Sequence, residues 1–111
     1  MILKPSDELW LPPPADFQAK RVERAVELSW KSVDGTIRWS IERRTLEPTG
    51  WSDWRTMDTG KAPITAWRDD SPPARAVAYR VRALGLNRSL SDWSKTIYVR
   101  SAETNPTNAK P

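Results

Sequence analysis

Adjacent carboxylates occur at Asp7–Glu8 and at Asp69–Asp70, and they are the groups of this chain that could move protons. General acid–base catalysis needs such a carboxylate in a pocket, near a group that shifts its pKa. Neither pair has a histidine or a further acid beside it in the sequence. We therefore expect both pairs to form turns and solvated charge, with no part in catalysis.

The hydroxyls of Ser91 and Ser94 could serve as nucleophiles if a base lay next to them. Such a base is most often histidine, and the chain contains no histidine. It also contains no cysteine, which excludes disulfide scaffolds and cysteine-based zinc sites. The isolated glycines Gly50, Gly60 and Gly85 form no loop that could cradle a phosphate. The sequence therefore predicts a protein that is not an enzyme and that holds no cofactor or metal.

Length and charge restrict the class of protein further. A chain of 111 residues is long enough for one domain with one modest hydrophobic core. The 18 basic residues exceed the 14 acidic ones by a net charge of +4, and the two signs are interspersed. This predicts a mild attraction to acidic surfaces but falls well short of a nucleic-acid-binding signature. No apolar run approaches the roughly 20 residues of a membrane span, so no membrane contact is expected.

Prolines and polar residues divide the chain into three segments. Residues 1–14 contain Pro5 and the run Pro12–Pro14, which favour an extended arm. Residues 101–111 are polar and predict a loose C-terminal tail. The folded domain is therefore expected at residues 15–100.

Alternation of apolar and polar residues recurs through the expected domain, and helical periodicity does not. Val26, Leu28 and Trp30 alternate with polar residues, as do Ile37, Trp39 and Ile41, so each set is expected to form one buried face of a strand. The expected strands are 17–22, 26–30, 37–42, 51–58, 64–67, 77–83 and 97–99. Seven short strands separated by turn signals predict an all-β fold, a two-sheet antiparallel sandwich.

Four segments in this order resemble a known family. They are Val26–Trp30 (Val-Glu-Leu-Ser-Trp), Ile37–Arg44 (Ile-Arg-Trp-Ser-Ile-Glu-Arg-Arg), Ala78–Ala83 (Ala-Tyr-Arg-Val-Arg-Ala) and a Ser-Leu-Ser-Asp-Trp-Ser run. Together they resemble the fibronectin type III pattern over residues 15–100. The resemblance implies that Trp30 is the core tryptophan of the second strand and Tyr79 the tyrosine of the sixth. Ser71-Pro72-Pro73 replaces the leucine-x-proline that is common before that strand.

The segment Ser91–Ser94 resembles the second half of the Trp-Ser-x-Trp-Ser motif of cytokine receptor modules. The resemblance implies that Trp93 stacks against Arg80 and Arg82 of a neighbouring strand. The first tryptophan of the motif is missing. We therefore expect a structural role for Trp93, as for Trp39, and no receptor function.

Two sets of residues are candidates for partner binding. Leu9, Trp10 and Leu11 put apolar mass on the arm, which either folds back onto the sandwich or anchors the arm in a neighbouring protein. The second set lies on the outer face of the sheet, where basic side chains could attract an acidic partner or could be solvated or stacked on aromatic rings. We expect this face to carry Arg38, Arg44, Arg80, Arg82, Tyr98 and Arg100, with Glu42 as its one acid. The predicted contact residues on it are Arg80, Arg82 and Arg100.

Function is inferred from the resemblance and from the organisation of the chain. A single sandwich with an apolar, proline-rich arm and no export signal is similar to small accessory domains of bacteriophage virions. We expect a multi-copy structural protein of a virion head or tail, otherwise a cytoplasmic protein, that contacts other structural proteins through the arm and a sheet edge. The alternative is a carbohydrate-binding or cell-surface-binding module in which Trp51, Trp54 and Trp67 form a coplanar exposed set.

Overall fold

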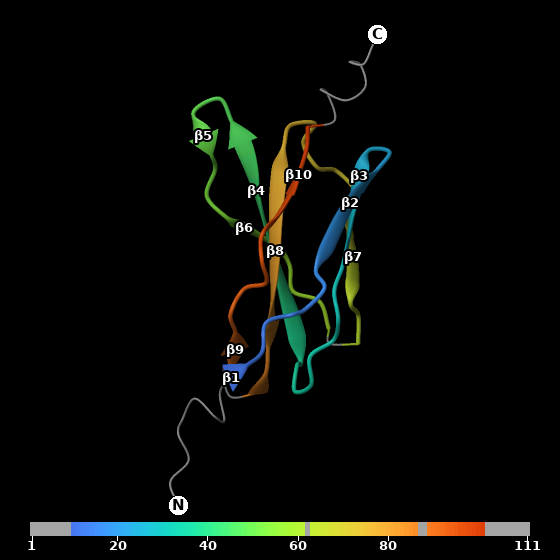
Figure 1. Cartoon of the computed structure of the whole chain (residues 1–111), viewed down its shortest axis with the longest axis vertical. Helices are drawn as coiled ribbons and strands as arrows, with labels where there is room; N and C mark the ends of the chain where they lie inside the picture. Colours follow the sequence, from blue (N-terminus) through green and yellow to red (C-terminus); the bar gives the residue numbers. More distant parts are fainter. Residues whose placement is uncertain (1–9, 62, 87–88, 102–111) are drawn as a thin grey trace, which may run out of the picture.

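Two β-sheets pack face to face in this protein, as a computed structural model shows for residues 10–61, 63–86 and 89–101 (Figure 1). One sheet contains seven strands and the other three. The strands are β1 (Trp10–Leu11), β2 (Gln18–Val22), β3 (Ala25–Ser29), β4 (Arg38–Glu47), β5 (Gly50–Trp51), β6 (Arg55–Asp58), β7 (Ala66–Asp69), β8 (Val77–Leu84), β9 (Leu90–Ser91) and β10 (Ile97–Val99).

The larger sheet is built around β4 and β8, which pair antiparallel from Arg38 opposite Leu84 to Thr45 opposite Val77. Its strand order is β1-β9-β8-β4-β5, with β10 also paired to β8 and β6 to β4. The smaller sheet has the order β2-β3-β7. All pairs between these strands are antiparallel except that of β1 with β9, which is parallel.

The predicted fold class is therefore confirmed. The seven predicted strands correspond to β2, β3, β4, β6, β7, β8 and β10, and β1, β5 and β9 are additional strands of two residues each. The predicted strand bounds are wrong in places. β4 begins at Arg38 and leaves Ile37 outside it, 42% exposed, and β7 begins at Ala66 and leaves Ile64 outside it, 54% exposed. The predicted strand 51–58 is broken, because residues 52–54 belong to no strand. In the described part of the chain, no helix has the length and apolar character that crossing a membrane requires.

The core lies between the sheets and is formed by the inward-facing residues of β3, β4 and β8. Trp30 and Trp39, both predicted to be structural, are buried and meet edge to face with 5.4 Å between ring centroids. Tyr79, the third predicted core aromatic, has no exposed surface. Apolar alternation therefore identified the core correctly on the central strands, because a residue and its second neighbour share one face of a strand.

The predicted arm, residues 1–14, falls only partly within the described residues. Trp10 and Leu11 form β1 beside β9, Leu11 packs against the core, and Pro14 is buried. Residues 1–9, Leu9 among them, lie outside the described residues. Of the predicted tail, Ser101 is described, and its hydroxyl donates a hydrogen bond of 2.9 Å to the carbonyl of Ala74.

Candidate functional site

Trp93 lies on the outer face of the larger sheet, against two arginines of β8. The guanidinium carbons of Arg80 and Arg82 lie 4.1 and 4.4 Å from the centroid of its ring. Arg80 and Arg82 are two residues apart on one strand, so both side chains point to the same face. The predicted stack of Trp93 on these arginines is confirmed.

The stack continues across β4 through residues that the sequence did not connect with it. Arg80 also lies over the ring of Trp54 at 4.2 Å, and Arg44 lies over Trp54 and Trp51 at 4.8 and 5.3 Å. We call this set the arginine–tryptophan ladder; its members are Trp51, Arg44, Trp54, Arg80, Trp93 and Arg82. Cation–π contacts at exposed sites contribute about 0.5–1 kcal/mol each, so the ladder stabilises the sheet.

Two serines hold Trp93 in place. The edge beside β8 is interrupted between β9 and β10. The amide of Ala83 donates a hydrogen bond of 2.8 Å to the hydroxyl of Ser91, and the amide of Val81 donates one of 3.1 Å to the hydroxyl of Ser94. The two hydroxyls thus replace backbone carbonyls of a regular ladder of hydrogen bonds. Both serines are buried, and their role is structural.

Arg80 is neutralised within the ladder. Its Nε and one terminal nitrogen donate to Oε1 of Glu42 at 3.0 and 2.7 Å. Arg82 stacks on Trp93 without such a carboxylate among the described residues. Arg100, the third predicted basic contact, is exposed. Its backbone carbonyl accepts a hydrogen bond of 3.0 Å from the guanidinium group of Arg21. Contact of these arginines with an acidic partner stays a prediction.

A buried polar cluster joins the two sheets, and sequence reasoning missed it. Oδ2 of Asp69 accepts hydrogen bonds from the hydroxyl of Tyr79 and from Arg43, both at 2.7 Å. Asp69 is 4% exposed, so the prediction of solvated charge is wrong for this residue, whereas Asp70 beside it is exposed and pairs with Arg68.

Alternation along β7 could have indicated this difference, because Asp69 shares a strand face with the partly buried Trp67. Burial, and then the hydrogen bond to Asp69, raise the pKa of Tyr79 far above the usual range of a phenol. The hydroxyl therefore stays protonated and donates. Among the described residues, no group of three or more histidine, cysteine, aspartate or glutamate side chains is placed to hold a metal ion.

One end of the sandwich exposes aliphatic side chains beside β1. Ile37, Leu86 and Leu90 are 42%, 70% and 44% exposed, and we call them the N-terminal end patch. They are linked through Leu84, whose carbonyl accepts a hydrogen bond from the amide of Ile37 at 2.7 Å and which pairs with Leu90. Leu90 in turn pairs with Trp10 of β1, so two of the predicted contact residues, Trp10 and Leu11, lie along this patch.

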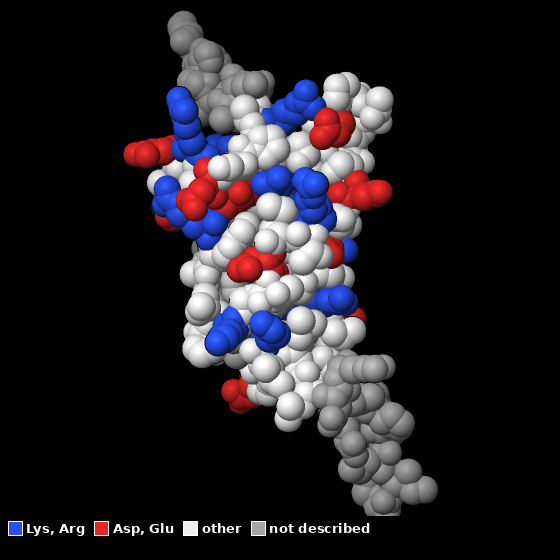
Figure 2. Space-filling view, turned by 180° about the vertical axis from the view of Figure 1, so that it is seen from behind, with Lys and Arg blue, Asp and Glu red and all other residues white. Residues whose placement is uncertain are grey.

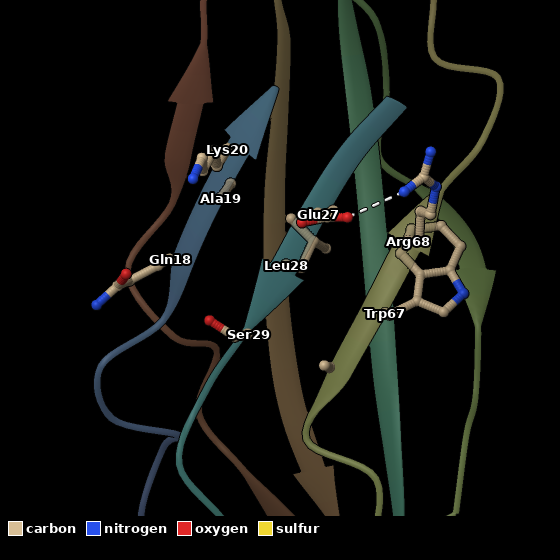
Figure 3. A pocket seen from close by; sticks show the side chains of 9 residues that line it. Gln18, Ala19, Lys20, Glu27, Leu28, Ser29, Trp67 and Arg68 are labelled. Carbon is tan, nitrogen blue, oxygen red and sulfur yellow. Dashed lines mark hydrogen bonds and ion pairs between the residues drawn. The ribbon is translucent and has the colours of Figure 1, made fainter. Parts of the chain in front are cut away.

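A groove of about 520 Å³ crosses the outer face of the smaller sheet (Figure 3). Polar side chains from all three strands point into it, among them those of Gln18, Lys20 and Ser29. At one side Arg68 pairs with Glu27 at 2.9 Å, which fixes both side chains along the wall. The groove has hydrogen-bond donors and acceptors but little exposed aromatic surface.

The three tryptophans considered for sugar stacking do not form one coplanar set. Trp51 meets Tyr98 edge to face at 5.5 Å, and two guanidinium groups lie over Trp54. Trp67 belongs to β7 of the smaller sheet and packs against the core. Stacking of sugar rings needs free aromatic faces on one surface, and this arrangement does not offer them.

The fold of this protein is similar to parts of many solved structures. No protein-family model matches the sequence, and no curated protein matches it. An Fn3-like protein from Clostridium thermocellum superposes with a TM-score of 0.64 at 18% identity, over 78% of this chain and 88% of that one. The fold is fibronectin type III-like.

Two enzymes with the same fold in part of their chains are also similar. A β-1,2-glucanase from Parabacteroides distasonis matches 81% of this chain with a TM-score of 0.65 and 20% identity. A pectate lyase from Erwinia chrysanthemi in complex with tetragalacturonic acid matches 78% of it with a TM-score of 0.66 and 13% identity. The chain spans only 12% of the glucanase and 28% of the lyase. A fibronectin type III-like fold is consistent with a non-catalytic binding or assembly module.

Proposed function

We propose that this protein is a non-catalytic interaction module that joins other protein chains through its N-terminal end patch. The observation that carries the proposal is the exposure of Ile37, Leu86 and Leu90 around one end of a small sandwich. Contiguous exposed apolar side chains on a small soluble domain are typical of contact surfaces. The sequence adds Leu9 and Trp10 to the chain at this end.

The distribution of charge supports the same end of the molecule. On the face shown in Figure 2, acidic and basic side chains are interspersed and are denser in the half away from β1 than in the half next to it. Interface centres are depleted in charged residues and enriched in aromatic ones. On that face, the half of the molecule next to β1 therefore offers more uncharged surface to a partner than the other half does.

The test uses a tagged full-length chain in extracts of the cells that produce it. Chemical crosslinking and mass spectrometry compare the wild type with a Leu86→Ser/Leu90→Ser variant. Leu46→Ser, which removes an exposed leucine elsewhere on β4, is the matched control. We expect the end variant to lose specific crosslinked partners and the control to keep them. The same partners in all three samples would overturn the proposal.

The setting that we propose is a virion, in which one contact is repeated over many copies of a small structural protein. It rests on the similarity in organisation to small accessory domains of bacteriophage virions. Quantitative mass spectrometry of purified particles from the source tests it directly. Absence of the chain from those particles would remove the virion setting and leave the interaction function to its own test.

The groove on the smaller sheet favours a second candidate function, binding of an oligosaccharide. The side chains of Gln18, Lys20 and Ser29 form no hydrogen bond within the described residues and can bond to sugar hydroxyls. Titration calorimetry with oligosaccharides of several backbone types, on the wild type and on Gln18→Ala/Ser29→Ala, measures this. No heat with any sugar would exclude the second candidate.

A further inference from the structure

Three cations lie together on the outer face of the larger sheet, next to the N-terminal end patch. Arg38 pairs across the sheet with Leu84 on one side and with Lys61 on the other. Residues that pair directly across antiparallel strands point to the same face. Arg82, two residues from Leu84 on β8, shares that face and is a diagonal neighbour of Arg38. We call these three residues the basic cluster: Arg38, Lys61 and Arg82.

The basic cluster has no acidic counterpart in the part of the chain that the structure describes. None of its side chains forms an ion pair or a side-chain hydrogen bond there. The Nε of Arg82 is buried and has no acceptor. An unpaired buried donor is costly, and three neighbouring cations repel one another. An anionic ligand would relieve both costs.

Arg82 is also held ready for such a ligand. Its guanidinium group stacks on Trp93 at 4.4 Å, which restricts the side chain before anything binds. A planar guanidinium group binds carboxylates in a fixed geometry with two parallel hydrogen bonds. Arg80, the next arginine on the same face, already binds a carboxylate, since two of its nitrogens donate to Oε1 of Glu42. Arg82 therefore differs from Arg80 in lacking a carboxylate among the described residues.

The sequence contains an acid pair shortly before β1. Asp7 and Glu8 precede Trp10, and three residues of extended chain span at most about 10 Å. Leu11 pairs with Ser91, whose hydroxyl accepts a hydrogen bond from the amide of Ala83, the neighbour of Arg82. The direction of β1 from Trp10 to Leu11 therefore leads toward Arg82. This direction favours the cluster of another copy over the cluster of the same copy.

We propose that Asp7 and Glu8 of one copy bind the basic cluster of a second copy of this chain. The inference rests on the proposed function, since Leu90 of the N-terminal end patch pairs with Leu84, which in turn pairs with Arg38 of the cluster. The apolar patch and the cluster thus form one continuous surface, on which the patch supplies apolar contact and the charges fix register.

Charge exchange on the full-length chain tests the proposal. One variant carries Asp7→Lys/Glu8→Lys and another carries Arg38→Glu/Lys61→Glu. Sedimentation equilibrium over a range of concentrations measures the association constant at low and at high salt. We expect wild-type association that weakens with salt, and a loss of about tenfold or more in each variant alone. Mixing the two variants in equal amounts should restore association, because the reversed charges are then complementary.

An Arg24→Glu/Arg55→Glu variant changes two exposed residues away from the cluster, with the same change in net charge as Arg38→Glu/Lys61→Glu, and should associate as the wild type does. Thermal unfolding of every variant confirms that it folds. Wild-type protein that stays monomeric at every concentration would overturn the inference, and so would a mixture that fails to associate. The proposed function has a separate outcome, since partners lost by the Leu86→Ser/Leu90→Ser variant would support it even if both charge variants associate normally.

Discussion

The hydroxyl of Tyr79 donates a hydrogen bond of 2.7 Å to the carboxylate of Asp69, and this bond joins the two sheets of the sandwich. Asp69 ends β7 of the smaller sheet, and Tyr79 lies in β8 of the larger one. Arg43 of β4 pairs with the same carboxylate oxygen, with 12% of its side chain exposed. A buried charge is tolerated here because it is paired and hydrogen-bonded.

Removal of the carboxylate should destabilise the fold strongly. Asp69→Ala leaves the guanidinium group of Arg43 and the hydroxyl of Tyr79 without their shared acceptor, and breaking a buried ion pair costs about 3–5 kcal/mol. Tyr79→Phe keeps the ion pair and should cost about 1–3 kcal/mol. Urea unfolding measures both. Asp70→Ala removes an exposed partner of Arg68 and should cost about 1 kcal/mol or less, and a similar loss in all three would contradict this account.

The stability of the protein should fall at high pH because of Tyr79. Burial and Asp69 raise the pKa of Tyr79 in the folded state above its value of about 10 in the unfolded chain. Above about pH 10 the unfolded state releases this proton while the folded state keeps it. The free energy of unfolding then falls by about 1.4 kcal/mol for each further pH unit. Below about pH 10 the stability that Tyr79 contributes is fully present.

Tyr79→Phe isolates this effect from other groups that titrate in the same range. The difference in unfolding free energy between the wild type and Tyr79→Phe should shrink as the pH rises above about 10. Tyr98→Phe, which changes an exposed tyrosine, is the control and should keep the wild-type decline. Parallel pH curves for the wild type and Tyr79→Phe would contradict the prediction.

The arginine–tryptophan ladder should show direct coupling between its members. A double-mutant cycle on Arg82→Ala and Trp93→Ala isolates their interaction, which we expect to be about 0.5–1 kcal/mol. A cycle on Arg38→Ala and Trp93→Ala is the comparison, and its coupling should be close to zero. Equal coupling in the two cycles would indicate a general effect of charge in place of stacking.

Gly85 should be intolerant of a side chain because β1 packs against it. A Cβ atom at this position would clash with the hydroxyl of Ser89 and would lie 3.0 Å from the carbonyl oxygen of Gly35 and 3.1 Å from a methyl of Leu11. Gly85→Ala should therefore cost about 1–3 kcal/mol and increase amide exchange at Leu11. Gly60→Ala meets only an ordinary contact of 3.7 Å and should change stability little. Equal tolerance at the two positions would show that β1 is not tightly packed.

Local pattern predicted most of the fold because strand alternation is a property of the chain itself. Val26, Leu28 and Trp30 share one face in any sandwich, so their burial follows from the spacing of apolar residues. The resemblance also predicted the stack of Trp93 on two arginines of β8. Ile37 shows the limit of alternation, because its exposure depends on where pairing with β8 ends.

The sequence by itself determined the sandwich, its buried aromatic residues and the absence of histidine and cysteine chemistry. Only the tertiary structure decided which groups bind the buried carboxylate of Asp69, because its partners Arg43 and Tyr79 come from strands of the opposite sheet. The tertiary structure also decided which arginines pair with a carboxylate, as Arg80 does, and which do not, as for Arg82 among the described residues. Charge pairing across a sheet depends on strand register, and register is set by the packing of residues that are distant in the chain.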